Sequence, residues 1–170
     1  MKYGLLGGCA LGLGGLGLTL QKGRPTDAPE GGLKSLSPRQ WATLVAAVAV
    51  INPGSEKLAS AVALKTARKM DRLIASLDTD LQGELGLILS LLENPIAGAI
   101  FDGNFRPFSS LSAKRRSEVI KAWQVSSINL RRAAIKSLLG LVHSCYWSQP
   151  ETWAHMGYPG PPALGGASGG

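Results

Sequence analysis

A length of 170 residues is enough for one domain with a single hydrophobic core, and the chain carries a net charge of +7. Only two cysteines and two histidines occur, which excludes a disulfide framework and leaves too few ligands for an ordinary metal site. The charge is local, because seven basic residues and one acidic residue lie between Lys114 and Lys136, so that this stretch alone carries +6. Because basic proteins often bind nucleic acid, nucleic acid is a candidate partner for the basic stretch between Lys114 and Lys136.

The N-terminal residues 1–21 are predicted to be an export signal or a membrane anchor. Residues 3–20 carry no charge and are largely apolar, as both kinds of segment require. Residues 6–9 (Leu-Gly-Gly-Cys) resemble the site at which bacterial lipoproteins are modified, so Cys9 is a candidate for lipidation. The sequence leaves open whether this segment is cleaved, lipidated at Cys9 or retained as a membrane anchor. Residues 22–34 are polar and rich in Pro and Gly, which predicts a linker.

The folded domain is predicted to span residues 35–162, and the Gly-rich residues 163–170 are predicted to be a disordered tail. The domain begins with a strong helix start, in which Ser37 and Gln40 fit a capping box and a proline takes the first helical position. Residues 52–54 (Asn-Pro-Gly) are expected to end this first helix.

Apolar residues at helical spacing predict two more helices in the first half of the domain. One runs from about residue 56 to residue 77. The next begins at Asp78 or Thr79, and Gln82 stands where the glutamine of a second capping box would be. Asn94 and the proline after it are expected to end or kink this third helix.

The second half of the domain follows an irregular loop at residues 102–108. Ser110 or Ser112 is predicted to open a fourth helix, apolar residues over 130–145 predict a long fifth helix, and Pro150 can open a short one. No alternating run long enough for a strand stands out. The predicted fold class is therefore all-α: an irregular bundle of about five helices with an extended C-terminal strap.

No reactive centre is evident in the sequence, which holds no nucleophile elbow, phosphate-binding loop, dinucleotide-binding fingerprint or metal-ligand cluster. His143, Ser144 and Cys145 are adjacent, but neighbouring positions on a helix point about 100° apart, so they do not form a nucleophile and its base. We therefore expect no catalytic, cofactor-binding or metal-binding residue in this chain.

Two features instead suggest contact with another protein. The basic residues do not share one obvious helix face, which favours a solvated or partner-facing surface over nucleic acid. Residues 145–162 hold two of the four tryptophans, two of the three tyrosines and four prolines, and such a segment either packs on its own bundle or contacts a partner. The predicted interface residues are Phe105, Phe108, Trp123, Arg131, Arg132, Tyr146, Trp147, Trp153, Tyr158 and Pro161.

Several short motifs share their order with a known family. The order runs through residues 51–54 (INPG), 108–111 (FSSL), 123–126 (WQVS), 131–132 (RR), 146–153 (YWSQPETW) and 157–161 (GYPGP). It resembles the small-subunit family of gluconate 2-dehydrogenase and related flavin-dependent sugar and alcohol dehydrogenases of the glucose-methanol-choline type. It also resembles the helical region fused ahead of the flavin domain in some long-chain alcohol oxidases. The resemblance covers about residues 33–162, and its closing aromatic pattern is the most specific part.

The resemblance implies an accessory subunit without a cofactor of its own, which binds a large FAD-containing dehydrogenase subunit, helps it to fold and assists its export. It implies an exported, periplasmic location, membrane association through the N-terminus, and a cytochrome c subunit that takes the electrons. The sequence departs from the family because its N-terminal segment shows no twin-arginine export signal.

Two alternatives remain open at this point. In an oxidising compartment Cys145 either forms a disulfide with the partner subunit or stays a buried thiol. The alternative function is a membrane-tethered basic helical protein that binds nucleic acid or anionic lipid, and it would depend on Arg115, Arg116, Arg131 and Arg132.

Overall fold

The computed structural model describes residues 31–52, 56–153 and 157–160, and residues 56–60 in their backbone only. The predicted signal or anchor, lipidation at Cys9, most of the linker, Pro161 and the C-terminal tail lie outside the described residues.

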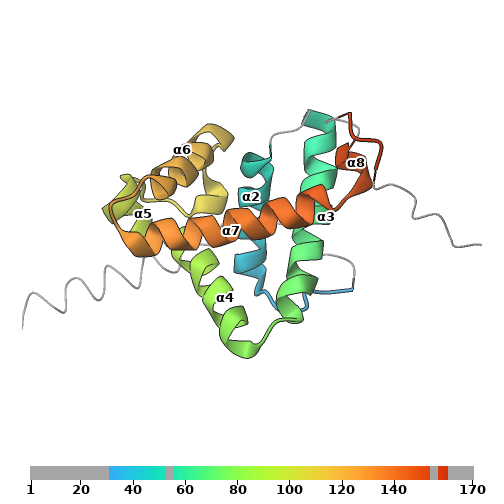
Figure 1. Cartoon of the computed structure of the whole chain (residues 1–170). Coiled ribbons are helices and arrows are strands. Elements are labelled where there is room, and N and C mark those ends of the chain that lie inside the picture. The colour runs from blue at the N-terminus through green and yellow to red at the C-terminus, as the bar shows by residue number, and fades with distance from the viewer. Residues whose placement is uncertain (1–30, 53–55, 154–156, 161–170) are drawn as a thin grey trace, which may run out of the picture.

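Every regular element among the described residues is a helix, which confirms the all-α fold class. Seven α-helices and a short 3-10 turn occur in these residues: the five predicted helices, the short helix expected at Pro150, and an eight-residue helix after Asn94 that was not predicted. In chain order they are α2 (Pro38–Ile51), α3 (Glu56–Ala75), α4 (Thr79–Glu93), α5 (Pro95–Asp102), η1 (Phe108–Ser110), α6 (Ala113–Gln124), α7 (Asn129–Trp147) and α8 (Pro150–Trp153) (Figure 1).

The helix starts follow the local signals in the sequence. Ser37 accepts a hydrogen bond from the N–H of Gln40, whose side chain accepts one from the N–H of Ser37, so the predicted capping box of α2 is present. Asn94 caps α5 by accepting from the N–H of Ile96 at 2.8 Å, and Ser112 caps α6. Each of these caps satisfies a backbone donor that the first turn of a helix leaves without a partner.

The second predicted capping box is absent, and Gln82 has a different role. Asp78 caps α4 by accepting from the N–H of Leu81 at 3.0 Å, which places Gln82 one position beyond the box. The Gln82 amide instead donates to the carbonyl oxygen of Leu77 at 2.8 Å and accepts from the hydroxyl of Ser35 at 3.3 Å. It therefore joins the turn between α3 and α4 to the segment ahead of α2.

The core lies around α2, which occupies the middle of the bundle (Figure 1). Helices α3, α4 and α6 pack against α2, and α7 runs across the bundle in contact with all four. The largest fully buried side chains are Trp41, Trp123, Phe108, Leu44, Met70, Ile74, Leu89, Ile135 and Leu138. One face of α7 covers the bundle. Its two ends contact α5 and α8, which pack little against α2.

Two buried carboxylates fasten the segment ahead of α2 and the short η1 turn to this core. Asp71 of α3 is 2% exposed and accepts hydrogen bonds from the backbone N–H groups of residues 34–36 at 2.7, 3.1 and 3.0 Å in chain order. Glu93, the last residue of α4, accepts from the N–H and the hydroxyl of Ser109 at 2.9 and 2.6 Å. A carboxylate is stable out of water only with such donors, so both contacts fix a segment to a definite place on a helix.

Within the described ranges no single helix is long and apolar enough to cross a membrane. Helices α4 and α5 together have sufficient length and composition, but the chain bends by 67° between them at Asn94.

Candidate partner-binding surfaces

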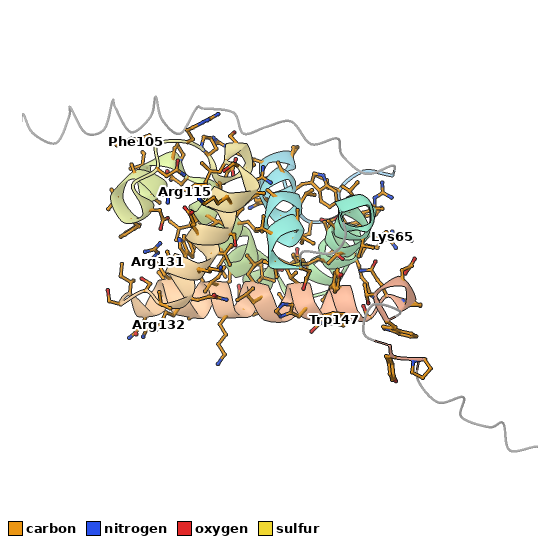
Figure 2. All side chains as sticks on the ribbon, turned by 90° about the horizontal axis from the view of Figure 1, so that it is seen from above. Lys65, Phe105, Arg115, Arg131, Arg132 and Trp147 are labelled. Carbon is orange, nitrogen blue, oxygen red and sulfur yellow. The ribbon has the colours of Figure 1, made fainter. Side chains whose placement is uncertain are left out.

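The nine described interface candidates do not form one surface. Phe108 lies in the core, and the other eight fall into two groups near the opposite ends of α7 (Figure 2). The first turn of α7 and its last residue are about 24 Å apart, at 1.5 Å per helical residue. We call the region formed by α5, residues 103–107 and residues 125–132 the α5 end. We call the last turn of α7, together with α8 and residues 157–160, the α8 end.

A buried ion pair holds the α5 end together. Asp102 closes α5 and pairs with Arg131 in the first turn of α7, and their side chains are 6% and 9% exposed. The Asp102 carboxylate also accepts from Nε1 of Trp123 at 3.2 Å, and Arg131 donates to the hydroxyl of Ser126 at 3.4 Å. A pair this deep has lost most of its hydration, and further hydrogen bonds stabilise it by occupying most of its polar atoms, while Nε of Arg131 is buried without a hydrogen-bond partner.

The guanidinium of Arg131 also lies between two aromatic rings. Its Cζ is 5.0 Å from the ring centroid of Phe101 and 4.9 Å from that of Trp123, both within the range of a cation–π contact. Phe101 is 43% exposed, so one side of this stack faces solvent while the other belongs to the core. The arginine thereby joins α5, α6 and α7.

Four of the predicted interface residues are corrected by their burial. Phe108, Trp123, Arg131 and Tyr146 are 2%, 2%, 7% and 8% exposed, so they offer almost no area to a partner in this conformation. They stabilise the chain's own fold instead. The sequence could not separate these roles, because aromatic and arginine side chains serve both cores and interfaces.

The arginines of the basic stretch are engaged within the chain, whereas its lysines are exposed. Arg115 pairs with Glu118 at 2.9 Å, and this hydrogen bond holds the pKa of the carboxyl below its usual range. Arg116 and Arg132 each donate to a backbone carbonyl oxygen. The exposed lysines of this stretch are Lys114, Lys121 and Lys136.

The α5 end carries a group of exposed apolar side chains that the sequence did not indicate. Only Phe105 was predicted to lie on a surface, and Leu130 was expected on the core face of its helix. The group consists of Ile100, Phe101, Phe105, Val125, Ile128 and Leu130, at 70%, 43%, 65%, 83%, 39% and 69% exposure. A signal was present, since apolar residues flank the turn at residues 126–127 on both sides.

Phe105 is held outward by a tight loop. Gly103 adopts a left-handed conformation with φ of 61°, and the N–H of Asn104 donates to the carbonyl oxygen of Gly98 at 3.0 Å. A Cβ on Gly98 would lie 2.7 Å from the carbonyl oxygen of Asn104, so only glycine allows this approach. Asn104 and Arg106 then exchange two hydrogen bonds around Phe105, at 3.1 and 3.2 Å.

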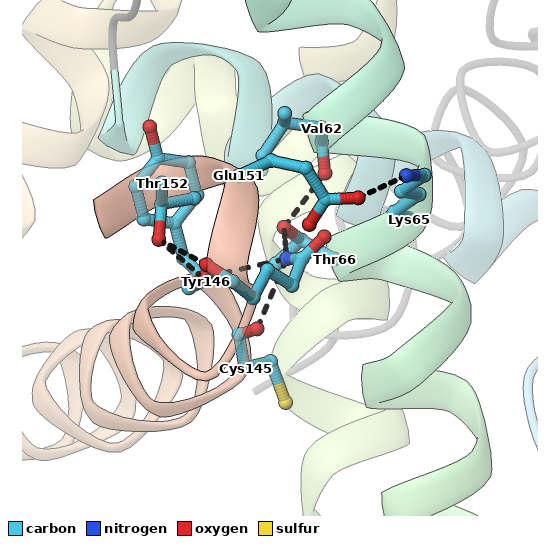
Figure 3. Close-up of polar contacts among 8 residues, drawn as sticks. Val62, Lys65, Thr66, Cys145, Tyr146, Glu151 and Thr152 are labelled. Carbon is cyan, nitrogen blue, oxygen red and sulfur yellow. Dashed lines mark hydrogen bonds and ion pairs between the residues drawn. The ribbon is translucent and has the colours of Figure 1, made fainter. Parts of the chain in front are cut away.

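Neutral hydrogen bonds hold the α8 end (Figure 3). The Gln149 amide donates to the hydroxyl of Thr66 on α3 at 2.8 Å and to the carbonyl oxygen of Cys145 at 3.0 Å. The hydroxyl of Thr152 donates to the carbonyl oxygen of Gln149 at 2.7 Å. Gln149, Thr66 and Thr152 are 7%, 0% and 0% exposed, so this network fixes α8 against α3 in a buried setting.

Three aromatic residues flank this network along the chain, and we call them the aromatic pad: Trp147, Trp153 and Tyr158. Nε1 of Trp153 donates to the carbonyl oxygen of Trp147 at 2.7 Å, and the Trp153 and Tyr158 rings meet edge to face at 5.7 Å. Trp147 and Tyr158 are 39% and 45% exposed, and Trp153 is half-buried. The pad therefore combines exposed ring surface with fixed positions.

Cys145 is a buried free thiol at 3% exposure, which is one of the two states left open by the sequence. Burial raises the pKa of this thiol, so little thiolate is present near neutral pH. A disulfide to another chain would require the α8 end to open. His143 is half-buried, and the described part of the chain contains no group of three or more His, Cys, Asp or Glu residues placed to hold a metal ion.

Comparisons with protein-family models, with curated proteins and with solved structures found no match for this chain.

Proposed function

We propose that this chain is a non-catalytic accessory subunit that binds a larger protein through the aromatic pad of the α8 end. The observation that carries this proposal is the pad itself: Trp147, Trp153 and Tyr158 are displayed together on a buried hydrogen-bond network. Tryptophan and tyrosine supply much of the binding energy at protein interfaces, and residues that are already fixed lose little entropy when they bind.

The proposed partner is a large FAD-dependent sugar or alcohol dehydrogenase subunit. The support is the order of motifs that resembles the gluconate 2-dehydrogenase small subunit, since its most specific part, residues 146–161, includes the whole pad. In this proposal the FAD belongs to the partner, a cytochrome c subunit takes the electrons, and the complex is exported to the periplasm. The chain's own contribution is to stabilise the partner and to assist its export.

The test is co-expression of the full chain with a large FAD-dependent dehydrogenase encoded beside it, followed by affinity purification on this chain. We expect flavin absorbance to co-elute. The double variant Trp147→Ala/Tyr158→Ala should weaken binding by about 30-fold or more, as expected for interface hot spots.

The matched control is Phe105→Ala, which removes an aromatic side chain of 65% exposure from the other end of the molecule. It should leave co-elution of the flavoprotein unchanged. Equal losses in the two variants, or a flavoprotein that is fully active and soluble without this chain, would contradict the proposal.

A further inference from the structure

The charge and the exposed apolar side chains of this protein occur in the same part of the molecule. Residues 95–140 contain eight basic and two acidic residues, a net charge of +6 out of the total of +7. They also contain six of the eleven large apolar side chains that are exposed among the described residues. Both features belong to α5, α6, the start of α7 and the connections between them.

The geometry brings the apolar side chains to one end of the molecule. The Asp102–Arg131 pair and the Phe101–Arg131 stack join the end of α5 to the start of α7. In the sequence Ile100 precedes Phe101 and Leu130 precedes Arg131. Phe105 projects from the neighbouring loop. Ile100, Leu130 and Phe105 therefore belong to a loop and to helix ends, and each is at least 65% exposed.

The cations of residues 95–140 are mostly of one kind. Arg115, Arg116, Arg131 and Arg132 donate hydrogen bonds within the chain, so the exposed charge comes mainly from Lys114, Lys121 and Lys136, together with the exposed Arg106. An arginine fork suits the defined geometry of one phosphate, whereas a lysine acts as a mobile point charge. Exposed lysines are therefore suited to a surface of many anions without fixed positions.

We infer that the α5 end binds the surface of a lipid bilayer that contains anionic headgroups. Lysines are attracted to the negative surface, and the apolar tips enter the boundary between headgroups and acyl chains. An open groove supports the same ligand chemistry, because Arg132 and Lys136 line it together with the apolar Ile135 and Leu139. Nucleic acid would neutralise the lysines but would leave Ile100 and Leu130 without an apolar contact.

This inference is independent of the proposed dehydrogenase partner, because it uses the opposite end of the molecule. It also agrees with the uncharged residues 3–20, since a chain held at a bilayer by that segment would keep its body near the headgroups. Two contacts, one apolar segment and one basic surface, are what stable membrane attachment commonly requires.

The first test measures binding of the full chain to vesicles of phosphatidylcholine with and without phosphatidylglycerol. We expect tighter binding to the anionic vesicles, with the difference removed by high salt. The triple variant Lys114→Glu/Lys121→Glu/Lys136→Glu should lower affinity for the anionic vesicles by about 100-fold, at about fivefold for each lysine near the surface. The control, Arg68→Glu/Lys69→Glu/Arg72→Glu, makes the same change in net charge on α3 and should have a much smaller effect.

The second test separates a bilayer from other anionic partners. Leu130→Ser and Leu87→Ser remove the same side chain at 69% and 68% exposure, but only Leu130 belongs to the α5 end. We expect Leu130→Ser alone to lower vesicle affinity, by about tenfold. A polarity-sensitive dye on F105C, in a C9S background, should shift to shorter wavelength on anionic vesicles, and the same dye on L87C should not.

Three results would overturn the inference. The first is equal affinity of the chain for both vesicle types. The second is an equal loss of vesicle affinity in the lysine or Leu130 variants and in their controls. The third is a dye at position 105 whose emission does not shift on anionic vesicles. Salt-sensitive binding to duplex DNA that ignores Leu130→Ser would assign the lysines to nucleic acid instead. Absence of vesicle binding by the parent chain, with flavoprotein binding intact, would also reject this inference and leave the proposed function standing.

Discussion

The two ends of α7 are stabilised by different chemistry. At the α5 end a buried aspartate and a buried arginine pair beneath exposed apolar tips, whereas at the α8 end an amide and two hydroxyl groups form a neutral network beneath aromatic rings. A buried ion pair fails badly when one member is lost, because the other charge stays behind without a partner. A neutral network fails more gradually, because each group loses one hydrogen bond.

The charge around the two ends differs as well. Residues 141–160 contain one acidic residue and no lysine or arginine, in contrast to the net charge of +6 over residues 95–140. One helix thus joins a basic, aliphatic end to a nearly neutral, aromatic end. The comparison teaches that exposed apolar groups of similar size can serve different surfaces, and that neighbouring charge decides which.

Among the variants that test this comparison, substitution of Arg131 should have the largest effect on stability. Arg131→Met should destabilise the fold by about 3–5 kcal/mol, because it leaves the Asp102 carboxylate buried without its cation. Urea unfolding followed by circular dichroism measures the change. Arg132→Met is the matched control, since Arg132 is exposed, and it should change stability by less than about 1 kcal/mol.

A double variant sharpens the result. Asp102→Asn/Arg131→Met removes both charges and should be less destabilised than the sum of the two single variants. Additive losses would show that the contact is not an interacting pair.

A smaller effect is expected at Gln149. Gln149→Leu should cost about 1–3 kcal/mol, because it leaves the hydroxyl oxygen of Thr66 without its donor and removes one of the two side-chain hydrogen bonds to the carbonyl oxygen of Cys145, to which Ser148 also donates. It should also speed the reaction of the Cys145 thiol with a disulfide reagent by about tenfold or more in a C9S background, since the thiol reacts only when this end opens. Thr66→Ser keeps the hydroxyl and should leave the rate close to that of the parent chain. An unchanged rate in Gln149→Leu would mean that the network does not hold the α8 end closed.

The smallest effect is expected at the ion pair between Lys65 and Glu151, whose side chains are 56% and 44% exposed. The hydrogen bond from Lys65 lowers the pKa of Glu151, so any stabilisation is present above the unfolded pKa of about 4.3 and is lost as pH falls through the folded value. Solvent screening makes the contribution small. Lys65→Gln should therefore lower the melting temperature slightly at neutral pH and not at all in strong acid, with Lys69→Gln as control. A difference that persists in acid would assign the effect to packing.

The sequence predicted the fold wherever the signal was local. The cap at Ser37 and the choice of Ser110 or Ser112 for the later helix start depend on residues within a few positions, so capping rules located them, whereas Asn94 was expected only to end or kink a helix and in fact also caps α5. Gln82 was misassigned because capping by Asp78 or Thr79 differs by one position.

The two surfaces were harder to predict, because they depend on contacts between distant residues. Asp102 and Arg131 are 29 positions apart, and nothing in the sequence of either helix indicates that they pair. Leu130 follows the helical spacing that favours a core position, but it is 69% exposed in the first turn of α7. Trp147 and Tyr158 were named as surface residues, yet the network that fixes α8 was not foreseen, since it requires Thr66 from another helix.

The hydrogen bonds between Asp71 and residues 34–36 have a consequence for folding during synthesis. The Asp71 carboxylate binds amides that are synthesised 35 to 37 residues earlier, so those amides must wait for α3 before they can dock. In a chain synthesised from its N-terminus, the amides of residues 34–36 therefore cannot bind Asp71 until α3 is complete. Once Asp71 binds these amides, a pull on the preceding chain is transmitted directly to α3.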